Sequence, residues 1–181
     1  MLKGEKVILR AVEKDDLKRL WELEQNVDLL EWSQPDWMPK SLAAREKEYE
    51  KQIEERHAER IDFVIEADGK VIGRIGIVHQ NRMAHNAIFG MGIFDREYLG
   101  RGYGRDAVRV FIDWAFRILN FRRLSLDVLA PNERAIEAYQ ACGFREEARL
   151  RQHSVFRGQP VDLIYMGLLR SEWQHVRAAR P

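Results

Sequence analysis

The sequence predicts a mixed α/β or α+β fold in a single domain spanning residues 1–181, and three observations lead to this prediction. A chain of 181 residues is long enough for one well-packed core and too short for two domains of ordinary size. Segments with strand-like and helix-like hydrophobic periodicity follow one another in the order βααβββαβαββ. No repeat, low-complexity segment or interdomain linker interrupts this order.

Local patterns define the elements of the first part of the chain. The apolar run at 6–12 predicts a strand, and the helix after it has Asp15 or Asp16 as a candidate N-cap. A structured loop is expected at 26–41, where prolines and tryptophans interrupt the periodicity. A helix with a solvated, charged face is expected at 42–60.

The next elements are strands. Residues 61–80 predict a β-hairpin, because two strand-like runs are joined by an Asp-Gly dipeptide that favours a two-residue turn. Another strand is expected at 87–95, with Gly90 and Gly92 in its interior. Glycine inside a strand indicates a bulge or the close approach of a ligand to the backbone.

The last part of the chain alternates between helices and strands. Residues 105–119 place their apolar side chains on one helical face, and the run at 122–130 predicts a strand. A loop and a helix are expected at 131–144, and a final hairpin at 150–169. We therefore expect a mixed, mostly antiparallel sheet of about seven strands flanked by about four helices.

Composition excludes several classes of function. The formal net charge of +1 does not suggest a nucleic-acid surface, and no apolar run approaches the length of a membrane span. The first residues show neither the long apolar region nor the cleavage site of a secretory signal. The single cysteine, Cys142, cannot form an internal disulfide, so we expect a cytoplasmic location.

The segment YLGRGYGRDA at 98–107 is the strongest candidate for a binding loop. A dinucleotide fingerprint would need a third glycine where this chain has Arg105, and no Gly-Lys-Ser/Thr follows as a P-loop requires. A glycine turn before a helix could instead hold a pyrophosphate on the free N–H groups of the helix start. The alternative is a plain glycine turn with solvated arginines.

A second motif identifies the family that this chain resembles. Residues 132–144 have the pattern N-x-x-A-x-x-x-Y-x-x-x-G-F, and G-x-G stands at 102–104. Together with LRAVEKDDL near the start and LRQHSVFRGQPVDLIYMGLLRSEW near the end, they resemble the GCN5-related N-acetyltransferase (GNAT) superfamily. The resemblance covers nearly the whole chain and is strongest to the branch of ribosomal-protein and polyamine acetyltransferases. It implies acetyl-CoA as co-substrate and no metal.

The resemblance also implies which residues bind the cofactor. The glycine loop at 99–104 would bind the pyrophosphate of acetyl-CoA, although Leu99 departs from the Gln or Arg of the family pattern. A backbone N–H near Gly92 or Ile93 would polarise the thioester carbonyl. Asn132 is either a helix cap or a cofactor contact. The predicted cofactor-binding residues are Gly92, Ile93, Leu99, Gly100, Arg101, Gly102, Tyr103, Gly104, Arg105 and Asn132.

Tyr139 is the predicted catalytic residue, because the family places a tyrosine here beside the thioester sulfur. It would protonate the leaving thiolate or stabilise it by a hydrogen bond. The general base stays open, since this chain has Ile88 where many relatives carry a glutamate. His79, His85, Glu31 or water could serve.

The resemblance also implies that the loop at 26–41 lies where relatives contact their acceptor. Its acidic residues Asp28, Glu31 and Asp36 could attract a cationic amine, and Trp32 and Trp37 could enclose its apolar part; a loop with inward-packed tryptophans is the alternative. The resemblance implies a small-molecule amine such as a polyamine or amino acid as acceptor, with a homodimer as one assembly to test. Protein N-terminal acetylation and a non-catalytic acetyl-CoA-binding module are the alternatives.

Overall fold

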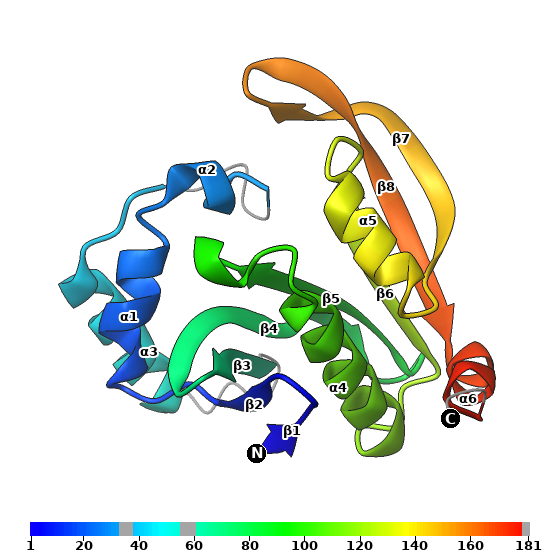
Figure 1. The fold of residues 1–181 in the computed structure, drawn as a ribbon, viewed down its shortest axis with the longest axis horizontal. Helices are drawn as coiled ribbons and strands as arrows, with labels where there is room; N and C mark the ends of the chain where they lie inside the picture. The colour runs from blue at the N-terminus through cyan, green and yellow to red at the C-terminus, as the bar shows by residue number, and fades with distance from the viewer. Residues whose placement is uncertain (33–37, 55–60, 179–181) are drawn as a thin grey trace.

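The computed structural model describes residues 1–32, 38–54 and 61–178, and a twisted sheet runs through the whole of this part (Figure 1). Its strands are β1 (Leu2–Lys3), β2 (Ile8–Ala11), β3 (Ile61–Ala67), β4 (Lys70–Asn81), β5 (Asn86–Ile93), β6 (Arg123–Leu129), β7 (Arg145–Phe156) and β8 (Gln159–Leu169). The order across the sheet is β1-β2-β3-β4-β5-β6-β8-β7. All neighbours are antiparallel except β5 and β6, which are parallel.

The helices surround this sheet. They are α1 (Asp16–Leu23), α2 (Val27–Leu30), α3 (Leu42–Glu54), α4 (Tyr103–Arg117), α5 (Glu133–Gln140) and α6 (Arg170–Ala178), with a 3-10 turn, η1 (Arg96–Tyr98). The predicted mixed fold is confirmed. The described residues add β1, the short α2 and α6 to the predicted elements, while the end of the helix predicted at 42–60 lies outside them beyond Glu54.

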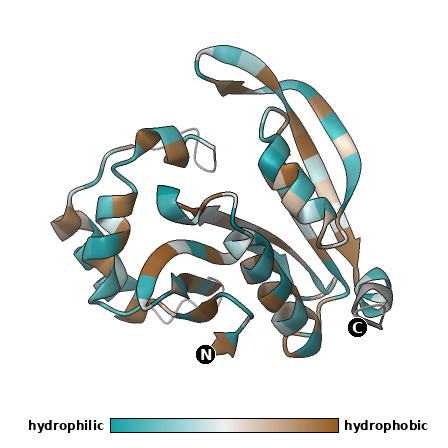
Figure 2. Cartoon of the chain, in the orientation of Figure 1, coloured by the Kyte–Doolittle hydropathy of each residue, from teal (hydrophilic) through white to brown (hydrophobic). Residues whose placement is uncertain are grey.

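The alternation of side chains along the strands determines which helix covers which face. Ile65 and Ile72 belong to the main core, which also contains the buried face of α4. Their neighbours Val64 and Val71 form a separate cluster with Leu20 of α1. Because successive strand residues point to opposite faces, α1 and α4 lie on opposite faces of the sheet. Both helices carry hydrophobic as well as hydrophilic residues, as such packing requires (Figure 2).

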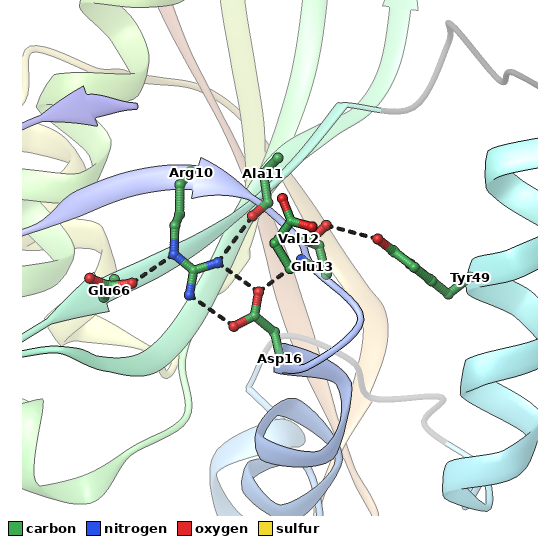
Figure 3. A network of polar contacts seen from close by, with 7 residues as sticks. All are labelled: Arg10, Ala11, Val12, Glu13, Asp16, Tyr49 and Glu66. Carbon is green, nitrogen blue, oxygen red and sulfur yellow. Dashed lines mark hydrogen bonds and ion pairs between the residues drawn. The ribbon is translucent and has the colours of Figure 1, made fainter.

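An arginine network attaches α1 to the sheet (Figure 3). Arg10 of β2 donates two hydrogen bonds to Asp16, at 2.7 and 2.8 Å, and one to Glu66 of β3 at 2.6 Å. Burial acts to raise the pKa of Asp16, but the hydrogen bonds from Arg10 and the Glu13 N–H outweigh it and lower that pKa. Asp15, one of the two N-cap candidates, is the N-cap residue of α1, although its side chain makes no capping hydrogen bond. Asp16 is the first residue of the helix, and its carboxylate is held by Arg10.

The parallel strands β5 and β6 pair over only part of their length at the centre of the sheet. Their ladder consists of three pairs and ends at Ile88 and Ser125, after which the two strands diverge. A β-bulge in β4, between Ile77 and His79, lies opposite this point. Bulges increase local twist, so this one turns the rest of β5 away from β6. The interior glycines of β5 pair regularly with β4, so of the two alternatives predicted for them the bulge is absent from β5, and the close approach of a ligand to the backbone stays a prediction.

The two predicted hairpins are present. Asp68 and Gly69, which join β3 to β4, have φ angles of 52° and 73°, as a type I′ turn requires. Arg157 and Gly158, between β7 and β8, have φ angles of 51° and 75°. The β7–β8 hairpin extends well beyond the end of α5 and ends on the same side of the molecule as α2 (Figure 1).

Candidate active site

A cavity of about 780 Å³ lies where β5 and β6 diverge. Residues 89–94 form one wall and residues 127–129 of β6 form the other. The glycine loop, the start of α5, and His153 and Ser154 of β7 complete it. Its volume is within the range of sites that enclose small organic ligands. We call this cavity the fork cleft.

The glycine loop borders the fork cleft and leads into α4. Gly100 and Gly102 have φ angles of 68° and 86°, a conformation that favours glycine. The first helical hydrogen bond runs from the Asp106 N–H to the Gly102 carbonyl. The N–H groups of residues 103–105 therefore precede the helical ladder, and the positive end of the helix dipole lies among them. This is the geometry that binds a phosphate or pyrophosphate.

The predicted loop residues fall into two groups: some line the fork cleft, and others support the loop from its other side. Leu99, Gly100, Gly102, Gly104 and Arg105 line the fork cleft.

Arg101 and Tyr103 instead support the loop from behind. Arg101 donates to the Glu97 carbonyl at 3.0 Å, and its own carbonyl accepts from the Lys6 ammonium at 2.9 Å. The Tyr103 ring is buried against Tyr98, with ring centroids 5.0 Å apart.

The N-terminal residues add a second support below the loop. Asp106, in the first turn of α4, is buried and accepts backbone hydrogen bonds from Lys6 at 2.7 Å and Val7 at 3.1 Å. This contact joins the turn between β1 and β2 to the start of α4. The glycine loop is thus fixed on both sides of its helix junction.

The backbone direction of β5 distinguishes between Gly92 and Ile93, which both line the fork cleft. The Phe94 N–H donates to the Ile72 carbonyl, on the β4 side of the strand. Because N–H groups alternate in direction along a strand, the Gly92 N–H points the same way and the Ile93 N–H points toward the cleft. Ile93 is therefore the donor placed to meet a carbonyl oxygen there.

Tyr139 reaches the fork cleft from α5 and is 7% exposed. Its ring packs edge-on against Phe89 and Phe144, at centroid distances of 6.3 and 6.1 Å. Burial raises the pKa of the Tyr139 phenol, and the nearby charges of Asp127 and Cys142 raise it further. The hydroxyl is therefore protonated at neutral pH and can donate a hydrogen bond into the cleft.

Asn132 and Cys142 have structural contacts. The Asn132 side chain caps α5 by accepting from the Ala135 N–H at 3.3 Å, and the residue also lines the fork cleft. Cys142 is buried, and its Sγ lies 3.6 Å from the Arg105 carbonyl as a donor. It thereby connects the end of α5 to the first turn of α4.

Asp127 is a residue of the fork cleft that the sequence analysis did not select. More than a third of the Asp127 surface is exposed. Its pKa is nevertheless raised, because desolvation outweighs a hydrogen bond from its own backbone and the charge of His153, which both lower that pKa. A signal was available, because Ser125 and Asp127 alternate with the apolar residues of β6 and so share one face.

The predicted acceptor residues meet the tip of the β7–β8 hairpin. Glu31, just after α2, accepts from Arg157 Nε at 2.8 Å and Nη2 at 2.5 Å. Trp32 lines the fork cleft and packs on Phe156, with ring centroids 4.1 Å apart. These two contacts connect α2 to the hairpin at the edge of the cleft.

Other candidates lie apart from the cleft. His79 is exposed near the end of β4, and His85 lies in the turn before β5 with a φ of 52°. Neither is among the residues that line the fork cleft. Asp28 forms an exposed ion pair with Arg96 at 2.9 Å. The predictions for Asp36 and Trp37 fall outside the described residues.

The fork cleft extends from a helix start, which suits an anionic group, to the gap between two diverging strands, an arrangement suited to a transferase with a long anionic cofactor. Comparison with known proteins identifies the family. Residues 6–145 match the family described as "Acetyltransferase (GNAT) domain", so the chain belongs to this family and is an acetyltransferase. This confirms the resemblance inferred from the motifs, and acetyl-CoA is the acetyl donor of the family.

Similar proteins cover almost the full length of the chain. The spermidine N(1)-acetyltransferase of Vibrio cholerae is 30% identical over 166 residues, which are 91% of this chain and 94% of that protein. The Escherichia coli K12 spermidine N(1)-acetyltransferase is 29% identical over 92% of this chain and 88% of its own length. A crystal structure of the V. cholerae enzyme with CoA and spermine superposes with a TM-score of 0.84, at 28% identity and 94% and 99% coverage. Among the described residues, no helix is long and apolar enough to span a membrane.

Proposed function

We propose that this chain transfers the acetyl group of acetyl-CoA directly to a primary amine of a polyamine. The observation that carries the proposal is the fork cleft, which joins the free N–H groups at the start of α4 to Tyr139 through one continuous cavity. The pyrophosphate would lie on the N–H groups of residues 103–105. The pantetheine arm would follow the open edge of β5 and bring the thioester to Ile93 and Tyr139.

The arrangement supports a single nucleophilic step. The lone pair of a neutral amine attacks the thioester carbon, and the Ile93 N–H stabilises the negative charge that develops on oxygen. When the C–S bond breaks, sulfur leaves as thiolate and accepts a hydrogen bond or a proton from Tyr139. The products are an N-acetylated amine and CoA.

The relatives and the cleft both favour a cationic acceptor. The two relatives are named for spermidine, and the solved V. cholerae enzyme holds spermine. In this chain Asp127 lines the fork cleft, and Glu31 lies beside Trp32 at its edge. Carboxylates next to an aromatic ring suit a chain of methylenes that carries ammonium groups.

An acceptor screen tests the proposal. Release of free CoA thiol would be measured with acetyl-CoA and spermidine, spermine, L-amino acids or peptides with free N-termini, using equal acceptor concentrations. Polyamines are expected to give the highest kcat/KM and a mono-acetylated product by mass spectrometry. Turnover only with peptides would indicate a protein N-terminal acetyltransferase. Acetyl-CoA binding without turnover of any acceptor would indicate a binding module.

Location and assembly belong to the same proposal. We also propose a cytoplasmic location, which the single cysteine favours. Sedimentation of the purified protein with and without spermidine tests whether it forms a homodimer.

A further inference from the structure

The acceptor nitrogen must lose a proton when it is acetylated, and the structure reduces the number of side chains that can accept this proton. Ile88, which faces the start of the fork, is apolar and cannot accept a proton. His79 and His85 do not line the fork cleft, and Glu31 is held by Arg157. Among the described residues, the carboxylates that line the cleft are Asp127 and Glu137.

The two carboxylates lie on opposite faces of the sheet. Glu137 belongs to α5, whose residues Ile136 and Tyr139 pack into the main core. Leu126 and Val128 of β6 point into the same core, so Asp127 between them points to the other face. That is the face covered by α1.

The pairing register of β5 and β6 places Asp127 where the two strands begin to diverge. Ser125 is the last residue of β6 that pairs with β5, and Asp127 is the next residue on the same face. Its carboxylate therefore borders the gap where no β5 strand lies alongside. His153 of β7 and Tyr139 of α5 lie near it and also line the cleft, and Tyr165 of β8 is its cross-strand partner.

We propose that Asp127 is the carboxylate that takes the proton from the acceptor nitrogen as the C–N bond forms, an inference that rests on the proposed function. The amine reaches the thioester from the α1 face, and the cofactor reaches it from the side of α4 and α5. The acceptor nitrogen and the departing sulfur thus meet side chains that come from opposite faces of the sheet.

The proton balance closes without a further reactant. The cationic acceptor first releases one proton to water. The neutral nitrogen then forms the C–N bond with its lone pair, and its surplus proton passes to the Asp127 carboxylate. The C–S bond breaks, and sulfur receives a proton from Tyr139. Asp127 then releases its proton to water, which its exposure allows, and Tyr139 is reprotonated from water. A carboxylate is a sufficient base, because nitrogen becomes strongly acidic once it is bonded to the acyl carbon.

The first test separates proton transfer from binding. In Asp127→Asn, kcat with saturating spermidine should fall by about 10²–10⁴-fold, while the acetyl-CoA Kd changes less than about twofold. Asp113→Asn, which removes an exposed carboxylate from α4, is the matched control and should keep wild-type kcat. A change confined to the KM for spermidine would mean that Asp127 only attracts the acceptor, and the inference would be overturned.

The second test is chemical rescue. Asp127→Ala leaves space where a small carboxylate can enter, so formate should restore kcat at least about tenfold, in proportion to its concentration. Formamide at the same concentration should restore nothing. A folded Asp127→Ala variant that formate does not rescue would contradict the inference. If the wild-type chain acetylates no polyamine, the proposed function itself fails, whereas an active wild type with an unimpaired Asp127→Asn variant refutes only the role of Asp127.

Discussion

Replacing Gly104 by alanine should raise the stability of the folded protein and, at the same time, lower its affinity for acetyl-CoA. Gly104 is the second residue of α4, and its φ lies outside the left-handed region. An added Cβ would lie 3.7 Å from Ile93 Cγ1 and 3.7 Å from Met91 Cε, both ordinary contacts. Neither backbone conformation nor packing within the chain therefore requires glycine here.

The magnitude follows from helix propensity. Alanine is preferred over glycine in a helix by about 0.8–1.0 kcal/mol, and by somewhat less in the first turn. A gain of about 0.5–1 kcal/mol should raise Tm by roughly 1–4 °C in a domain of this size. The same methyl group would stand beside the N–H groups of residues 103–105 and displace the pyrophosphate, so we expect the acetyl-CoA Kd to rise at least about tenfold.

Calorimetry of acetyl-CoA binding and thermal unfolding of the empty protein measure the two effects. Gly69→Ala is the control, because Gly69 has a φ of 73° in the β3–β4 turn, is not among the residues that line the fork cleft, and an added Cβ there would meet nothing within 4 Å. That variant should lose stability through backbone strain and keep the wild-type Kd. A folded Gly104→Ala protein that binds acetyl-CoA as tightly as the wild type would refute the assignment of this loop.

Further predictions concern catalysis and the contact at the edge of the cleft. Tyr139→Phe should lower kcat and kcat/KM together by about 10²–10⁴-fold with acetyl-CoA affinity unchanged; a loss of only a few-fold would remove Tyr139 from the chemistry. Cys142→Ala should keep kcat within about threefold, and initial rates should show a ternary complex; ping-pong kinetics would contradict this. If the Glu31 carboxylate binds the acceptor in competition with Arg157, Arg157→Gln should lower the KM for spermidine about 2–5-fold and Glu31→Gln should raise it. An increase in KM for both variants would show that the ion pair only holds the two segments together.

Local patterns were sufficient for most of the fold. The Asp-Gly turn, the amphipathic α4 and the capped start of α5 each depend on neighbouring residues, and each lies where the sequence predicted it. The missed elements depend on distant partners. The C-terminal helix α6 is secured by Trp173, which packs on Phe116 with ring centroids 5.4 Å apart, and β1 is too short to show a period.

The site was predictable as a set of motifs but not as a geometry. Spacing located the glycine loop and Tyr139, yet it could not show that Arg101 and Tyr103 support the loop rather than line the cleft. That distinction depends on the N-terminal segment, whose Lys6 reaches the loop across 95 positions of sequence. The sequence did not indicate Asp127, because its position matters only relative to the point where β5 and β6 stop pairing. That point depends on how the two strands pair and not on the sequence of either strand alone.

In the proposed function, the divergence of β5 from β6 is what would let transfer occur within a ternary complex. Two substrates that enter from opposite faces meet only in the gap between the strands, so neither blocks the path of the other. An acyl-enzyme route would need a nucleophilic side chain inside that gap, and Cys142 is buried against the first turn of α4 instead. In this proposal the backbone of β5 holds the thioester and the amine approaches from the α1 face, so the sheet would supply the alignment and the side chains at the reacting atoms would transfer protons.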